Sequence, residues 1–138
     1  MIFSNNKSGS PQWLGILNPS DGSLVSNFKL QDTSNSNRIA ILSEDSIILT
    51  PTQLLIGMAD IYTRFRVCRF THNPSLTYIW CWYNTNSNNA RVYAITLDPT
   101  QTFVFAGGYF DPASNNKIAL VMKIKFSDGS DGICRGWF

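Results

Sequence analysis

Charged residues are scarce in this chain, and their scarcity excludes several kinds of protein. Only 14% of the 138 residues are Asp, Glu, Lys or Arg, against about 25% in an ordinary globular domain. The formal net charge is +2, which is too small to predict nucleic acid or an anionic membrane surface as a partner. Hydrophobic residues make up 43% and aromatic residues 13%, so the sequence is that of a folded domain rather than a disordered segment.

Histidine is scarce, and the sequence motifs of nucleophilic enzymes are lacking. His72 is the single histidine, and the sequence contains no Gly-x-Ser-x-Gly, phosphate-binding loop or dinucleotide fingerprint. A zinc site needs clustered histidine and cysteine, which this sequence does not have. We therefore expect no enzyme activity, no metal ion and no cofactor.

The cysteines are few and odd in number. Cys68, Cys81 and Cys134 include no Cys-x-x-Cys pair. We favour three buried thiols that pack as small apolar side chains. The alternative is one disulfide with one cysteine left over.

Long apolar runs are absent. The longest, at 54–59, is far shorter than the roughly 20 residues of a membrane-spanning helix, so we expect no membrane insertion. Residues 1–12 lack the apolar core of a secretory signal and are expected to form a flexible lead-in.

Helical periodicity is missing too, because clusters of Pro, Gly or Asn interrupt every long apolar pattern. Segments rich in β-branched and aromatic residues recur between turn clusters instead. We predict an all-β fold with antiparallel strands at 13–17, 24–30, 38–42, 46–49, 53–58, 64–70, 77–83, 91–97, 102–107, 117–126 and 132–138.

Two sequence patterns recur along the chain. PTQLLI at 51–56 matches PTQTFV at 99–104, and LNPSDGS at 17–23 recurs as FSDGS at 126–130. FTHNPS at 70–75 is a degenerate copy between the latter two. These matches indicate a unit of about 50 residues with about four strands, the size of one β-propeller blade.

The stretch 91–138 carries a family resemblance. It reads RVYAITLDPTQTFVFAGG and then VMKIKFSDGS, which resembles the bacterial-type β-propeller repeats, with GMA at 57–59 replacing AGG in a divergent middle copy. The resemblance implies antiparallel four-stranded blades, about two and a half in number, within a single domain at 13–138: a hairpin at 13–30, a blade at 38–83 and a blade at 90–138. A β-sandwich is the alternative fold, and the resemblance implies no particular function.

Two and a half blades do not close a ring, because closed propellers use about 4 to 8. The chain is then part of a longer polypeptide, or copies or partner chains complete the ring, or two sheets fold face to face as a sandwich. Open sheet edges favour association. We therefore expect partner contacts at the two ends of the repeat domain, with Trp13, Trp137 and Phe138 as candidate residues.

The strand at 77–83 is aromatic on both faces. Strict alternation places Tyr78, Trp80 and Trp82 on one face and the intervening residues on the other. We favour a position between two layers. The alternative is that Trp80 and Trp82 form a stacking platform for a sugar or for a partner's side chains.

Two strands carry paired basic residues. Arg64 with Arg66, and Lys123 with Lys125, each share one strand face. We interpret these faces as solvated and protected from edge pairing by their charge. A basic stripe for an acidic partner is the alternative.

These patterns predict a non-catalytic structural or protein-interaction module, which self-associates or completes a larger β-propeller assembly. Its partners are then proteins, either further copies or other subunits. One alternative is a carbohydrate- or ligand-binding, lectin-like module whose partner is a glycan. The other is a fragment of a larger propeller enzyme.

Overall fold

The computed structural model describes residues 2–5, 12–30, 44–59, 65–72, 76–83, 90–111 and 117–137. These residues form antiparallel β-sheets and one short 3-10 turn, so the all-β prediction is confirmed. The elements are β1 (Ile2–Asn5), β2 (Gln12–Leu17), β3 (Leu24–Leu30), η1 (Glu44–Ser46), β4 (Ile47–Leu49), β5 (Gln53–Ala59), β6 (Phe65–Thr71), β7 (Thr77–Tyr83), β8 (Ala90–Leu97), β9 (Phe103–Phe110), β10 (Ile118–Lys125) and β11 (Asp131–Trp137).

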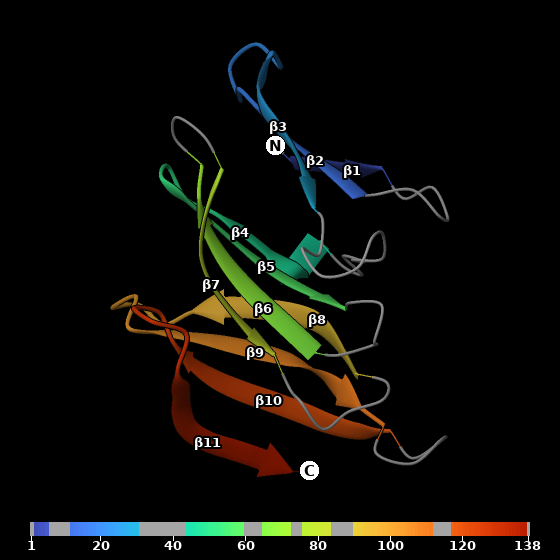
Figure 1. The fold of residues 1–138 in the computed structure, drawn as a ribbon, viewed down its shortest axis with the longest axis vertical. Coiled ribbons are helices and arrows are strands. Elements are labelled where there is room, and N and C mark those ends of the chain that lie inside the picture. Colours follow the sequence, from blue (N-terminus) through green and yellow to red (C-terminus); the bar gives the residue numbers. More distant parts are fainter. Residues whose placement is uncertain are drawn as a thin grey trace.

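The described strands form three sheets in chain order. The N-terminal sheet has the order β1-β2-β3, the middle sheet β4-β5-β6-β7 and the C-terminal sheet β8-β9-β10-β11. Each sheet is a meander in which strands adjacent in the sequence pair with one another. Figure 1 shows the three sheets following one another from one end of the molecule to the other.

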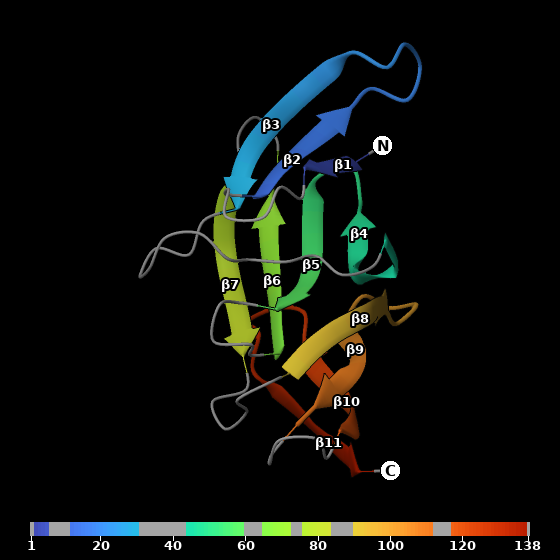
Figure 2. The same cartoon turned by 90° about the vertical axis from the view of Figure 1, so that its right-hand side faces the viewer.

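The middle sheet is buried on both faces, and it lies between the other two sheets in Figure 2. One face packs on the C-terminal sheet through Leu55, Phe65, Val67 and Trp80. The opposite face packs on Leu14 and Ile16 of the N-terminal sheet through Leu54, Ile56, Met58 and Cys68. Side chains alternate along a strand, so the continuous apolar run of β5 supplies both faces.

The predicted strands coincide with β2 to β11 apart from shifts at their ends. The segment predicted at 38–42 lies outside the described residues. The largest shift is at β9, which continues past its glycines to Phe110. A Cβ at Gly108 would lie 1.8 Å from the Arg91 carbonyl oxygen, beside the register shift between Val92 and Ala94. Gly108 therefore permits a close approach within the sheet and does not end the strand.

The expected flexible lead-in is wrong at Ile2–Asn5. These residues form β1 and pair with β2, from Ile2 opposite Ile16 to Asn5 opposite Trp13. Four residues are too short for a recognisable alternation pattern. Their structure comes from pairing with the edge of β2, the next strand along the chain.

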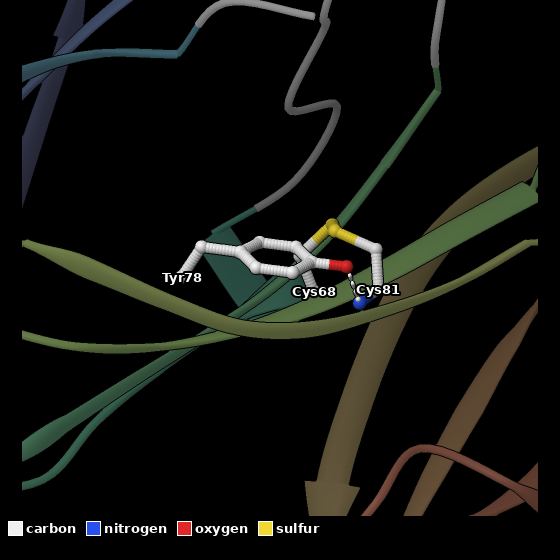
Figure 3. The surroundings of a disulfide bond; sticks show 3 residues. All are labelled: Cys68, Tyr78 and Cys81. Atoms are coloured by element: carbon white, nitrogen blue, oxygen red, sulfur yellow. Dashed lines mark hydrogen bonds between the residues drawn. A yellow bond between two sulfur atoms is a disulfide. The ribbon is translucent and has the colours of Figure 1, made fainter. Parts of the chain in front are cut away.

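The favoured interpretation of three buried thiols is also wrong, because Cys68 and Cys81 form a disulfide between β6 and β7 (Figure 3). They are direct register partners, and their Cα atoms lie 4.1 Å apart. The bond lies on the face of the middle sheet that packs on the N-terminal sheet. The structure thus agrees with the alternative of one cysteine pair.

Loss of this disulfide should destabilise the chain. The two cysteines are 13 positions apart, and a loop of that length gives about 3 kcal/mol through restriction of the unfolded chain. We expect the Cys68→Ala, Cys81→Ala double variant to lose about this free energy of unfolding in urea. Reductant should shift the wild-type midpoint in the same direction. The Cys134→Ser variant should remain as sensitive to reductant as the wild type. A wild-type urea midpoint that does not change with reductant would contradict the Cys68–Cys81 pairing.

Candidate functional site

The middle and C-terminal sheets are joined at the turn between β10 and β11. We call this contact the inter-sheet joint, and it comprises Arg69, Trp80, Trp82, Phe126, Gly129 and Asp131. Trp80 is only 6% exposed, and its indole N–H donates to the Phe126 carbonyl oxygen at 3.0 Å. A Cβ at Gly129 would lie 2.7 Å from a carbon of the Trp80 ring, and Gly129 has a φ of +73°. Glycine is therefore required here by both the turn and the packed indole.

Arg69 adds a charged contact to the same carbonyl group. Its Nη1 donates to the Phe126 oxygen, and its Nε donates to the side-chain oxygen of Gln53. The guanidinium lies 3.7 Å from the centre of the Phe126 ring, a favourable cation–π geometry. Burial lowers the pKa of Arg69, but a guanidinium stays protonated in proteins. Arg69 thus links β5, β6 and the β10–β11 turn.

Trp82 completes the inter-sheet joint at its outer end. Its indole N–H donates to the Asp131 carboxylate, and its ring lies edge-to-face with Phe65 at a centroid distance of 6.0 Å. Trp80 and Trp82 therefore lie between two sheets, the position we favoured. The buried ring of Trp80 does not offer a face on which a sugar could stack.

Tyr78 does not share the face of Trp80 and Trp82, and this part of the alternation prediction is wrong. A register shift pairs Arg69 with Trp80 and Phe70 with Tyr78, so β7 has one extra residue, Ile79. This β-bulge turns Tyr78 to the disulfide face. There the Tyr78 hydroxyl accepts a hydrogen bond from the Cys81 backbone N–H at 2.8 Å (Figure 3).

The candidate basic residues do not form one stripe. Arg66 pairs with Met58 on the face toward the N-terminal sheet and lies 5.8 Å from the centre of the Tyr83 ring. Lys123 lies 3.8 Å from the centre of the Phe103 ring, and Lys125 is exposed at the end of β10. Arg64 lies outside the described residues.

The expected position at an open sheet edge is wrong for Trp13, because β2 is the central strand of the N-terminal sheet. Trp13 pairs with Asn5 and Lys29 within β2. Trp137 pairs with Leu120 at the end of β11, which is the edge strand of its sheet. The structure describes the backbone of these two tryptophans but not their side chains, and Phe138 lies outside the described residues.

The recurring SDGS segments form the same turn in two sheets. In the first, Asn18 N–H donates to the Ser23 carbonyl oxygen at 2.8 Å, and Gly22 N–H donates to the Asn18 carbonyl oxygen at 2.9 Å. In the second, Lys125 bonds to Ser130 and Gly129 bonds to Lys125 with these same distances. The two glycines have φ values of +72° and +73°. The turns therefore coincide, one between β2 and β3 and the other between β10 and β11.

The recurring PTQ segments also occupy corresponding turns, but the second turn is longer. Thr50 N–H donates to the Gln53 carbonyl oxygen at 2.8 Å, whereas Asp98 N–H donates to the Phe103 carbonyl oxygen at 3.1 Å. Gln53 starts β5 and Phe103 starts β9. The sequence match therefore aligns the turns correctly but displaces the strands that follow them.

In the described part of the chain, the histidine is bonded within a sheet and the potential metal ligands are dispersed. His72 is engaged within the middle sheet, where its Nε2 lies 2.8 Å from the Thr50 carbonyl oxygen. No group of three or more His, Cys, Asp or Glu side chains in the described ranges is placed to hold a metal ion. Across these same ranges, no helix is long and apolar enough to span a membrane.

Comparison with known proteins finds no relative: no protein-family model, curated protein or solved structure matches this chain. Its function is therefore inferred from its own geometry.

The two indoles of the inter-sheet joint should differ in their contribution to stability. Trp80→Phe removes a donor from a buried contact, and we expect a loss of about 2 kcal/mol in the free energy of unfolding. Trp82→Phe removes a bond that is exposed to solvent, so its loss should be no more than about half as large. Urea unfolding of both variants measures the difference, and equal losses would contradict it.

The turn carboxylates should make stability depend on acid pH. The pKa of Asp98 is lowered first by the hydrogen bond from the Phe103 N–H and then by that from Thr100. The pKa of Asp21 is lowered in the same way by Ser23. A lowered folded-state pKa gives stability that is present above the unfolded pKa, near 3.9, and is lost as the pH falls through the folded value. Urea midpoints should therefore fall below about pH 4, and Asp98→Asn should flatten that fall. An unchanged pH profile in the variant would refute this role.

Proposed function

We propose that this chain is a non-catalytic structural module that self-associates by stacking its β-sheets into a larger assembly. One observation carries the proposal. The middle sheet is covered on both faces by neighbouring sheets, whereas the C-terminal sheet presents apolar side chains on the face turned away from the middle sheet.

This outer face of the C-terminal sheet consists of side chains from β8, β9 and β10 that point away from the buried core. Its apolar members include Tyr93, Phe103, Phe105, Tyr109, Ala119 and Val121. Tyr93 and Val121 are 45% and 43% exposed. Contiguous exposed apolar surface on a sheet is typical of an interaction site, and its burial contributes roughly 25 cal/mol for each Å² removed from water.

Propeller-type blades are the form of assembly that best fits these sheets. The middle and C-terminal sheets are four-stranded antiparallel meanders, and both pack face to face with a neighbour. The coincident turns support a repeated unit. The N-terminal sheet supplies a three-stranded part of another unit. Blades beyond these would come from further copies or other subunits, because a closed ring uses about 4 to 8.

A two-layered sandwich receives less support. In such a fold each sheet leaves one face to solvent, but both faces of the middle sheet are buried here. The lectin-like alternative is weakened by the burial of Trp80.

The native mass of the purified chain tests the proposal. We expect sedimentation to show a multiple of 15.5 kDa that grows with protein concentration, because association buries the outer apolar face. Denatured mass, measured on the same sample, gives the mass of one chain. A folded monomer at every concentration would refute self-association.

A further inference from the structure

The middle and C-terminal sheets pack on their preceding sheets in the same way. The strand registers show which residues of the two sheets are equivalent. Gln53 opposite Thr71 starts the β5–β6 ladder, and Phe103 opposite Lys125 starts the β9–β10 ladder. Aligning these two pairs makes each residue of the middle sheet equivalent to one of the C-terminal sheet. Two equivalent sets then face the preceding sheet and are buried against it: Leu54, Ile56 and Cys68 in the middle sheet, and Val104, Ala106 and Met122 in the C-terminal sheet.

The same alignment identifies what the outer face of the C-terminal sheet corresponds to. Its residues Phe105, Ala119, Val121 and Lys123 are equivalent to Leu55, Phe65, Val67 and Arg69, which face the C-terminal sheet. Val67 is 0% exposed, whereas its equivalent Val121 is 43% exposed. The outer face of the C-terminal sheet is thus equivalent to the face of the middle sheet that packs on the C-terminal sheet. Among the described sheets, none covers this outer face.

The N-terminal sheet has a surface that corresponds to the face by which the C-terminal sheet packs on the middle sheet. Its Asn18–Ser23 turn has the same backbone hydrogen bonds as the Lys125–Ser130 turn. Leu17 is therefore equivalent to Ile124, and Leu24 is equivalent to Asp131. Each pair is a register pair at the start of its turn. Ile124 is fully buried against the preceding sheet, whereas its equivalent Leu17 is only half-buried. Leu24, like its equivalent Asp131, is exposed.

We propose, on the basis of the self-association above, that the N-terminal sheet of a second copy stacks on the outer face of the C-terminal sheet. This contact repeats the step by which the C-terminal sheet stacks on the middle sheet. The surfaces on the two copies differ, so the contact is head-to-tail, and it either closes into a ring or continues as a filament.

Two local features make the N-terminal sheet a fitting occupant. Lys123 stands at the position of Arg69, and the Pro19 carbonyl group stands at the position of the Phe126 carbonyl group that Arg69 binds. A lysine ammonium is a suitable donor to that oxygen. The charged contact of the inter-sheet joint would therefore re-form between copies, with Lys123 in place of Arg69, whereas Gly132 stands at the position of Trp80.

The second feature is a match in polarity. Trp82 pairs with Val67 and reaches Asp131. At the equivalent position, Gly136 pairs with Val121, and Leu24 stands in the place of Asp131. A tryptophan bonded to an aspartate is thus replaced by a glycine facing a leucine, which exchanges a polar contact for an apolar one.

A complementation experiment tests this geometry. Val121→Glu places a charge on the outer face of the C-terminal sheet, and Leu24→Glu places one on the outer face of the N-terminal sheet. Both residues are exposed, so each variant should fold. Each blocks one half of the contact, and we expect each alone to be a monomer at concentrations where the wild type assembles.

A mixture of the two variants should form a dimer and nothing larger, because each retains the half that the other lacks. Ile79→Glu is the matched control, since Ile79 is a 39% exposed apolar residue on the middle sheet, and it should assemble as the wild type does. Lys123→Met should weaken assembly about tenfold through loss of one charged hydrogen bond.

The outcomes separate this inference from the proposed function. If the wild type assembles but both Glu variants assemble equally well, the head-to-tail contact is wrong and self-association stands. Two monomeric variants that fail to complement would also overturn the contact, pointing to a face that pairs with itself or to a different occupant. A wild type that is monomeric at every concentration removes both proposals.

Discussion

The burial of β5 on both faces is the constraint on which the architecture depends. Leu54 and Leu55 are adjacent in the chain and fully buried, and they point to opposite sides of the sheet. One faces the N-terminal sheet and the other faces the C-terminal sheet. A strand of this kind is stable only between two layers, so the core divides into two clusters and the three sheets must stack.

The turns determine how the stacked sheets meet. Gly129 gives the β10–β11 turn its left-handed residue, and it also leaves the space that the Trp80 ring occupies. The Phe126 carbonyl group in that turn accepts hydrogen bonds from both Arg69 and Trp80. One short segment therefore closes a hairpin and also fixes the position of the neighbouring sheet. The turn at Asn18–Ser23 has the same backbone hydrogen bonds, and no atom lies within 4 Å of a Cβ built on Gly22.

Local patterns predict the strands well because alternation and turn residues are properties of short segments. The sheet class and the sites of the SDGS turns follow from these patterns. Non-local features do not: the Cys68–Cys81 bond depends on the β6–β7 register, and the bulge at Ile79 changes the face of Tyr78. The strand at Ile2–Asn5 likewise exists through its pairing with β2. The inter-sheet joint could not be predicted from the sequence. Its acceptor is the backbone carbonyl group of Phe126, and every residue has such a group.

The scarcity of charge explains why the outer face of the C-terminal sheet is apolar. A sheet that ends a stack usually has a polar outer face, but this chain has too few charged residues to supply one. Lys123 lies over Phe103 and Lys117 lies over Tyr109, so two cations cover two aromatic rings of the C-terminal sheet. Val121 of β10 remains exposed. A lysine over a ring is displaced more readily than a packed side chain, because its charge remains hydrated on a flexible stem. The outer face therefore combines hydrated, displaceable cations with exposed apolar side chains.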